Sequence, residues 1–238
     1  PGRSESFNID NLPVFVILLL YENATVHTEL LHFHKTGGNM GTTQPIREKE
    51  KLKLFLEYYQ TEVPSERNLA LLSLGTYTAL RISDILALRW QDVYDFSQKC
   101  YKEHLFVQEK KTGKHTVIAL HPRLGEILER YRSTRNPKPA DFVFTKATDY
   151  SKPLNRSQAF RIIKKAAENT VHEEHISCHS LRKTFGYQAW KQGTPPALLM
   201  DIYNHSSYRI TKKYLGIEQD ERDSLFLQLI SLDNMKNF

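Results

Sequence analysis

The sequence predicts a mainly helical fold with one small antiparallel β-sheet, an α+β class. Apolar residues recur at helical spacing through most of the chain after residue 42. The exception is residues 104–120, where HLFVQ and HTVIAL alternate apolar and polar residues as strands do. With 238 residues, of which 40% are hydrophobic and 25% charged, the chain has an ordinary globular composition and can bury its own core.

Helices are expected from the spacing of apolar residues and from capping residues. Thr42 or Thr43 could cap the first helix, and Ser83 and Asp84 could cap a short helix within RISDILALRW. Strands at 104–108 and 115–120 are joined by EKKTGK, which predicts a hairpin with a lysine cluster and a glycine at its turn. A short strand is possible at 142–144. The predicted helices cover residues 45–60, 69–77, 122–132, 155–168, 179–192, 195–203 and 219–232.

Residues 1–41 differ from the rest and suggest a division into an unassigned segment, 1–41, and a single domain, 42–238. The segment could be a short packed element with a linker, or partly non-native leader sequence. Its apolar run, residues 13–21, is well short of the roughly 20 residues that span a bilayer, so no membrane role is predicted. The two cysteines, Cys100 and Cys178, offer no disulfide framework, which suits a reducing cytosol.

Two segments of the chain are rich in basic residues. The formal net charge is +6, which favours a polyanionic partner. Basic residues interleaved with aromatic ones in RSQAFRIIKK and YRITKKY are typical of a DNA-binding surface, although solvated helix faces would have the same composition. The candidate DNA-binding residues are Arg156, Arg161, Lys164, Lys165, Arg209, Lys212 and Lys213.

The motif HSLR, residues 179–182, stands at the start of a predicted helix. Its i,i+3 spacing places His179 and Arg182 on the same face, where both can reach one small anion. The amino end of the helix adds partial positive charge there. By itself the motif is weak, because HxxR also occurs as an ordinary surface pair.

The segment NHSSYRITKKYLG, residues 204–216, holds His205 and Tyr214 nine positions apart with basic residues between them. Asn204 tolerates a left-handed backbone, so a sharp turn just before His205 is plausible. On its own, Tyr214 could equally be a packing aromatic.

Arg81 and the hairpin lysines each have a structural and a functional interpretation. Arg81 could pair with Asp84 at i,i+3, and the lysines could belong to a solvated loop. HEEHISCH, residues 172–179, also raises a zinc site, but its spacing matches neither HExxH nor paired CxxC ligands.

Taken together, ALRISDILALRWQDV, EKKTG, HSLRKTFG and NHSSYRITKKYLG resemble the catalytic domain of the tyrosine recombinase (phage integrase) family, over about residues 42–232. Order and spacing fit, including the 32 residues from Arg182 to Tyr214. There are two departures. Asn204 stands where the family commonly has glycine, and residues 1–41 are too short for the separate core-binding domain that such recombinases usually carry.

The resemblance implies six roles on one DNA phosphate. Arg81 and Arg182 would grip the scissile phosphate, and Lys111 would protonate the leaving 5′ oxygen. His179 would assist proton transfer at the nucleophile, His205 would donate a hydrogen bond to a phosphate oxygen, and Tyr214 would attack.

These residue types suit that chemistry. Guanidinium groups stay charged and bind phosphate oxygens in a fork, and a phenol with an ordinary pKa of about 10 needs nearby cations or a base. A 3′-phosphotyrosine conserves the energy of the diester bond, so no cofactor is expected.

The favoured interpretation is a site-specific recombinase or integrase that cleaves and rejoins double-stranded DNA, located in the cytoplasm with the nucleoid. The resemblance further implies a homotetramer on DNA through the C-terminal helix, Glu221 to Leu232, although that helix could instead pack on its own domain. A type IB topoisomerase relaxing DNA as a monomer, and a catalytically silent DNA-binding protein, remain as alternatives. The intact set of six residues argues against the silent protein.

Overall fold

A computed structural model describes residues 43–111, 113–172 and 175–229. The chain divides into two units, residues 1–39 and 40–238, and every described residue belongs to the second unit. The predictions made for residues 1–41, the apolar run at 13–21 and Thr42 lie outside the described residues.

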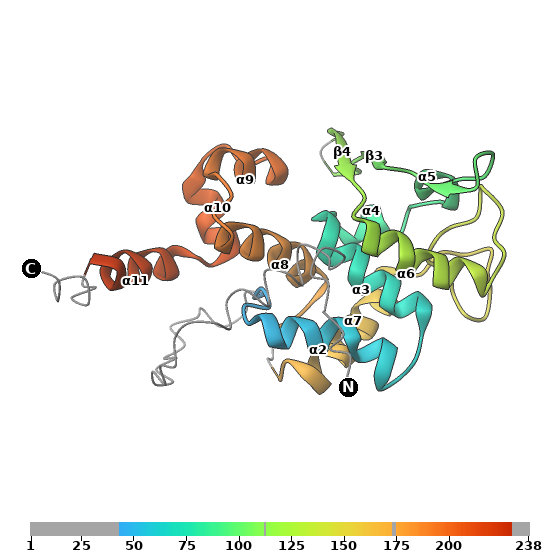
Figure 1. Cartoon of the computed structure of the whole chain (residues 1–238), viewed down its shortest axis with the longest axis horizontal. Coiled ribbons are helices and arrows are strands. Elements are labelled where there is room, and N and C mark those ends of the chain that lie inside the picture. Colours follow the sequence, from blue (N-terminus) through green and yellow to red (C-terminus); the bar gives the residue numbers. More distant parts are fainter. Residues whose placement is uncertain (1–42, 112, 173–174, 230–238) are drawn as a thin grey trace, which may run out of the picture. The chain divides into compact units, whose positions relative to one another are not determined.

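The described part of the chain is mostly helical, as the apolar spacing predicts (Figure 1). Within it, no helix has both the length and the apolar character needed to cross a membrane. The helices are α2 (Lys49–Thr61), α3 (Glu66–Thr78), α4 (Ile82–Ile85), α5 (Trp90–Val93), α6 (Pro122–Ser133), α7 (Arg156–Thr170), α8 (Cys178–Lys191), α9 (Pro196–Tyr203), α10 (Tyr208–Leu215) and α11 (Glu218–Leu229).

Helix α3 lies at the centre of the main core, where it packs against α2, α6 and α8. Leu69 to Gly75 are all buried, so this helix has no polar face. Gly75 allows the close approach of α8, because a Cβ at that position would lie 3.2 Å from the Cβ of Leu181. Burying a large aromatic or aliphatic side chain contributes on the order of 2 kcal/mol, and this core includes the fully buried Phe55, Trp90 and Phe144.

The predicted hairpin is confirmed. Strands β3 (His104–Gln108) and β4 (His115–Ala119) pair antiparallel, with Gln108 opposite His115. Gly113 in the turn has φ +70°, a conformation that favours glycine.

The expectation of one sheet is wrong, because β1 (Tyr94–Asp95) and β2 (Cys100–Tyr101) form a second two-stranded sheet. Residues 142–144 do not form a strand, since Phe142 makes only an isolated bridge with Arg89.

Two capping predictions are also wrong. Helix α2 begins at Lys49 rather than at Pro45, because residues 43–48 are not helical and side chains of α8 bind the backbone at Ile46. There the Ile46 N–H donates to the Thr184 hydroxyl at 2.9 Å, and the Gln188 amide donates to the Ile46 carbonyl at 3.1 Å. Helix α4 is preceded by Arg81, and neither Ser83 nor Asp84 caps it.

A second, smaller hydrophobic cluster joins α8 to α9, α10 and the start of α11. Helix α8 bridges the two cores, since Leu181 belongs to the main core and Tyr187 to the smaller one. Tyr214 packs against this smaller cluster, which consists of Tyr187, Leu199, Tyr203, Leu215 and Ile217. The junction between the two cores is therefore where the predicted residues of α8 and α10 meet.

Candidate active site

Arg182 is buried at the junction between the two cores. Its guanidinium donates hydrogen bonds to the carbonyl oxygens of Ala79, just after α3, and of Ile202 in α9, the latter at 3.4 Å. The same guanidinium lies over the ring of Tyr203, 4.7 Å from its centroid. Arg182 is thereby held by residues from both sides of the junction, after α3 and in α9. Its guanidinium charge therefore has a defined position.

Tyr214 and His205 lie against each other on the α9–α10 side of this arginine. Their ring centroids are 5.2 Å apart in an edge-to-face arrangement. Both rings also contact Tyr203, with centroid distances of 5.6 Å for His205 and 5.2 Å for Tyr214. Lys183 adds a further cation, with its Nζ 5.2 Å from the centroid of the Tyr214 ring. Arg182, His205 and Tyr214 are thus brought together around Tyr203.

The turn before His205 has the predicted backbone. Asn204 is left-handed, with φ 55° and ψ 47°, and ends α9. The His205 N–H then donates to the Met200 carbonyl at 2.9 Å, and its Nδ1 lies 3.0 Å from the hydroxyl of the buried Thr211. This contact orients the imidazole and leaves Nε2 as the nitrogen for a ligand.

The electrostatic environment favours the neutral forms of Tyr214 and His205, beside the charged arginines. Burial raises the pKa of the Tyr214 phenol above its ordinary value, while the charge of Arg182, hydrogen bonding by Arg182 and the charge of Arg81 oppose that rise. Burial, followed by the charges of Arg182 and Arg81, lowers the pKa of His205. Both guanidinium groups therefore act at Tyr214 and at His205.

Arg81 does not pair with Asp84, contrary to the structural interpretation of its i,i+3 spacing. Its guanidinium instead forms an ion pair with the buried carboxylate of Glu109, 28 positions along the chain. Asp84, also buried, accepts a hydrogen bond of 3.1 Å from the Lys110 N–H. The two acids join the segment around Arg81 to the base of the hairpin turn.

Sequence reasoning missed Glu109, although the strand period contains a signal for it. Leu105 and Val107 are buried in alternation with exposed neighbours, and the same period places Glu109 on the buried side. An acid at such a position needs a cationic partner, and Arg81 supplies one.

His179 occupies the second position of α8 and is exposed, whereas Arg182 on the same helix is buried. Desolvation of the covered part of its ring is the main cause that lowers the pKa of His179, followed by the charges of Arg156, Lys183, Arg182 and Arg81. The charges of both candidate phosphate-binding arginines thus act on the His179 imidazole and favour its neutral form.

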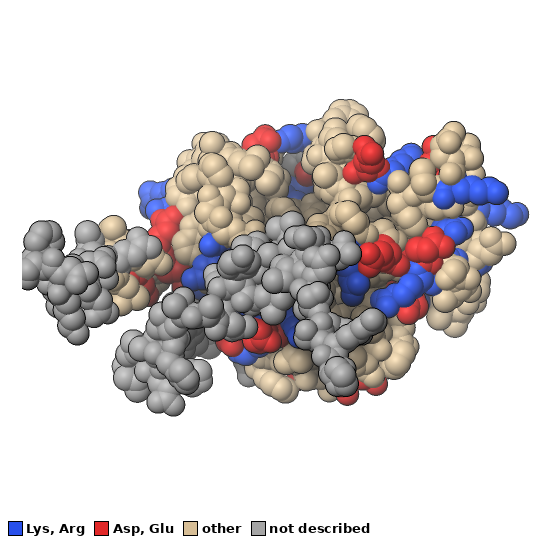
Figure 2. Space-filling view, in the orientation of Figure 1, with Lys and Arg blue, Asp and Glu red and all other residues tan. Residues whose placement is uncertain are grey.

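Lys111 lies exposed in the hairpin turn, and among the described residues its side chain makes no hydrogen bond or ion pair. Thr112, its neighbour, lies outside the described residues. Lys114 has a different position, since its ammonium pairs with Asp201 of α9 at 2.8 Å. The surface is hollowed between the α9–α10 side and the hairpin, and charged side chains lie at the rim of that hollow (Figure 2).

The other basic candidates fall into three groups. Arg156 and Arg161 line a shallow hollow with Ser177 and Cys178, where the amino ends of α7 and α8 come together. Lys165, Arg209 and Lys213 are exposed. By contrast, Lys164 pairs with Glu168 at 3.5 Å and Lys212 pairs with Glu221 at 3.1 Å.

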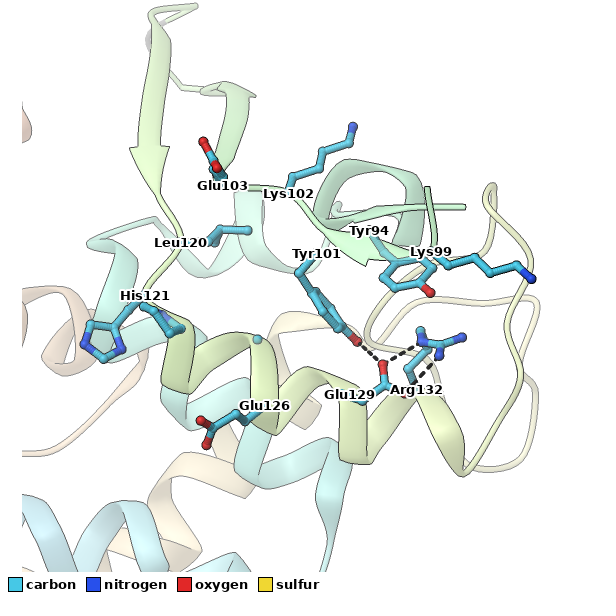
Figure 3. Close-up of a pocket in the computed structure, with 12 residues that line it drawn as sticks. Tyr94, Lys99, Tyr101, Lys102, Glu103, Leu120, His121, Glu126, Glu129 and Arg132 are labelled. Atoms are coloured by element: carbon cyan, nitrogen blue, oxygen red, sulfur yellow. Dashed lines mark hydrogen bonds and ion pairs between the residues drawn. The ribbon is translucent and has the colours of Figure 1, made fainter. Parts of the chain in front are cut away.

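A separate hollow of about 580 Å³ contains none of the six predicted residues (Figure 3). Within it the Tyr101 hydroxyl donates to Glu129 at 3.1 Å, and Arg132 donates to both oxygens of that carboxylate. These interactions hold β2 against α6. In the described ranges, which omit Glu173 and Glu174 of the HEEHISCH segment, no group of three or more His, Cys, Asp or Glu could hold a metal ion.

Comparison with known proteins agrees with this fold. Residues 46–221 match the model of the phage integrase family. The chain is 39% identical over 181 residues to the probable integrase/recombinase YoeC of Bacillus subtilis, covering 76% of this chain and 93% of that one. Other relatives are named tyrosine recombinases.

Two solved structures share the fold at low sequence identity. The XerA recombinase aligns with a TM-score of 0.62 at 19% identity, covering 77% of this chain and 64% of that one. The XerH site-specific recombinase, in a post-cleavage complex with its difH substrate, aligns with a TM-score of 0.59 at 20% identity, covering 73% and 50%. The chain therefore spans between half and two thirds of these solved recombinases.

The fold and the relatives define the class as the tyrosine recombinases, enzymes that cleave and rejoin DNA in site-specific recombination. This chain belongs to the phage integrase family. The resemblance stated from the motifs is thereby confirmed, and the quoted relatives give no support to a topoisomerase or to a silent DNA-binding protein.

Proposed function

We propose that this protein cleaves and rejoins DNA at a specific site with Tyr214 as the nucleophile. The observation that carries the proposal is the packing of Tyr214 against His205 beside a buried Arg182 that is fixed from both cores. Attack of the phenol oxygen on a DNA phosphate forms a 3′-phosphotyrosine and releases a 5′ hydroxyl. Attack by a 5′ hydroxyl then reverses the step, so the bond energy is conserved and no cofactor is required.

Arg81 and Arg182 stabilise the phosphate during this exchange. The pentavalent transition state carries more negative charge than the diester, and two fixed guanidinium groups favour it. Removing one preorganised donor of this kind typically lowers the rate by about 10²–10³-fold. The charges of both arginines already act on Tyr214, which supports their convergence on the atom that attacks.

The two histidines have separate tasks. His205 presents Nε2 to a phosphate oxygen, because Nδ1 faces Thr211. His179 accepts the phenol proton as Tyr214 attacks, and its lowered pKa keeps the imidazole in the required neutral form at pH 7.

Lys111 protonates the leaving 5′ oxygen from the hairpin turn. An alkoxide leaves poorly, so a positioned acid accelerates its departure. The base of the turn is anchored through Asp84 and Glu109, while Lys111 itself projects from its exposed part. Bound DNA would bring this ammonium to the phosphate.

Double-stranded DNA is the partner, which the substrate-bound complex of XerH and the basic composition of this chain support. Arg156 and Arg161 line a hollow at two helix amino ends and would bind the backbone there. Lys165, Arg209 and Lys213 extend this interface, and Lys164 and Lys212 would exchange their acidic partners for phosphate. Such a protein would act in the cytoplasm, with the nucleoid.

Assembly on DNA as a homotetramer through α11 completes the proposal. The first half of α11 is tied to its own chain, since Asp220 pairs with Arg47 and Glu221 with Lys212. The second half presents Leu225, Phe226 and Leu227, which are 55%, 62% and 77% exposed. A neighbouring subunit would cover this apolar end. The catalytic unit in this proposal is residues 42–238.

A nicked suicide duplex tests the chemistry. Its target would be selected by the protein from a random-sequence pool, and the nick lets the short fragment that carries the released 5′ hydroxyl diffuse away, so that the covalent intermediate accumulates. Wild-type protein should form an adduct that survives denaturation, and Tyr214→Phe should bind the duplex without forming it. Equal cleavage by both proteins would remove Tyr214 from the assigned role.

A further inference from the structure

We propose that Glu109 is the positioning residue for Arg81, an inference that rests on the proposed function. The carboxylate belongs to the residue that follows β3 and pairs with the guanidinium across 28 positions of sequence. Glu109 is 3% exposed, and its side chain is more deeply covered than that of Arg81, at 4% against 18%. The acid thus lies beneath the arginine, on the protein side of the guanidinium.

The carboxylate belongs to a residue whose own backbone N–H and carbonyl are both hydrogen-bonded. The Glu109 N–H donates to the Lys114 carbonyl at 2.9 Å, and its own carbonyl accepts from Gly113 at 2.8 Å. These two bonds close the hairpin turn around the residue. Because the acid cannot follow the arginine into solvent, it restricts a side chain that otherwise has many rotamers.

The geometry of the pair leaves the arginine able to bind a phosphate. The ion pair uses NH1 of the guanidinium and Oε2 of the carboxylate. Within the described residues, the remaining N–H groups of Arg81 have no hydrogen bond to protein. A guanidinium held at one nitrogen can still present an edge to two phosphate oxygens.

The contact also joins two groups that act on opposite ends of the scissile bond. Glu109 precedes Lys111 by two residues, and Asp84 fixes the intervening Lys110 N–H from α4. The arginine that binds the phosphate and the lysine that protonates the leaving oxygen are therefore parts of one anchored unit. Loss of the Glu109 carboxylate should therefore change the orientation of the Arg81 guanidinium more than it changes the affinity for DNA. Many other cations of the protein bind the DNA backbone.

The test compares three substitutions at one position. Glu109→Gln keeps an oxygen acceptor at nearly the same place, Glu109→Asp keeps the charge but draws it back by one methylene, and Glu109→Ala removes the acceptor. We expect single-turnover adduct formation on the suicide duplex to fall about 10- to 100-fold for Ala and Asp, because small misplacements of a catalytic group have effects of this size. Gln should stay within about threefold of wild type, and the dissociation constant for DNA should change less than about threefold in all.

The matched control is Glu103→Ala, which removes an exposed carboxylate from the same hairpin. It should react as wild type does. If Glu109→Ala does not fold, as judged by its melting temperature, the Gln and Asp variants still decide the question. A wild-type rate for Asp, or a Gln variant as slow as Asp, would overturn the positioning role.

A double-mutant cycle separates this inference from the proposed function. With Arg81→Ala in the background, Glu109→Ala should cause no further loss of cleavage rate, because there is no guanidinium left to orient. Independent, multiplying losses would overturn the inference while leaving Arg81 as a phosphate ligand. Full cleavage by Arg81→Ala alone would instead contradict the proposed function.

Discussion

The hydroxyl of Tyr203 donates a 2.7 Å hydrogen bond to the carbonyl oxygen of Arg182, and the ring of the same tyrosine lies under the Arg182 guanidinium. Tyr203 therefore holds both the backbone and the side chain of the arginine. Gly186, one turn further along α8, makes room for it, since a Cβ there would lie 2.8 Å from the Cε2 of Tyr203 and 2.7 Å from a methyl group of Leu215. The packing of three helices at this point sets the position of Arg182 relative to Tyr214.

Tyr203→Phe tests this arrangement. The substitution keeps the ring under the guanidinium but removes a buried hydrogen bond, so the free energy of unfolding should fall by about 1 kcal/mol. Adduct formation should fall severalfold, because the α8 backbone at Arg182 loses one restraint. Chemical denaturation and single-turnover trapping measure the two effects. Tyr187→Phe, in the same small cluster, is the control for adduct formation, because its ring lies against Arg47 rather than Arg182. An unchanged stability in Tyr203→Phe would contradict the account.

Lys111→Ala should lower the cleavage of an ordinary phosphodiester by about 10²-fold, as expected for loss of a general acid. A duplex with sulfur in place of the bridging 5′ oxygen should restore the rate, because a thiolate leaves without a proton. Lys110→Ala and Lys114→Ala are the controls from the same turn, and neither should show this rescue. If the sulfur substrate rescued Lys110→Ala or Lys114→Ala instead, the general acid would be that lysine.

The histidines predict the acid side of the pH profile. The pKa values of both His179 and His205 are lowered from 6.5, mainly by burial, so their neutral forms persist below that pH. His179 is protonated, and so loses its capacity to act as a base, only when the pH falls to its lowered pKa. The rate of adduct formation at limiting protein, which reports the free enzyme, should therefore be level near pH 7 and decline below 6.5. A decline centred above 6.5 would contradict the assignment of His179 as base.

If the exposed end of α11 docks on a neighbouring subunit, formation of the tetramer on DNA should depend on Leu225 and Phe226. Leu225→Gln with Phe226→Gln should leave the melting temperature nearly unchanged, because both side chains are exposed, while abolishing tetramers on DNA in mass photometry. Leu54→Gln on α2, where the leucine is 52% exposed, is the control. Substitution is a cleaner test than deletion after Gly216, which would also remove the fully buried Ile217. Undiminished tetramers would show that α11 does not dock on a neighbour.

The sequence was informative wherever a feature depends on nearby residues. The period of two in residues 104–120, with Gly113 at the turn, gave the hairpin, and Asn204 gave the left-handed turn before His205. The resemblance of the motifs to the family also implied that Arg182, His205 and Tyr214 act together, and the structure brings these three residues together around Tyr203.

Features that depend on distant partners could not be predicted in this way. The start of α2 is displaced because Thr184 and Gln188 bind the backbone of Ile46 from 138 or more positions away. Arg81 pairs with Glu109, 28 positions away, rather than with Asp84, three positions away, and Oδ1 of Asp84 accepts from the Lys110 N–H. Local spacing offers each group a partner, but tertiary packing chooses among the candidates.

The most direct test of the central claim identifies the residue that carries the DNA. After trapping on the suicide duplex, nuclease digestion and trypsin, the adduct should be found by mass spectrometry on Tyr214, in the peptide YLGIEQDER between Lys213 and Arg222. Tyr203 and Tyr208 lie together on a different tryptic peptide, which ends at Arg209, so the assignment is unambiguous. A nucleotide on the Tyr214 peptide is the predicted result, and a nucleotide on any other residue would contradict the account.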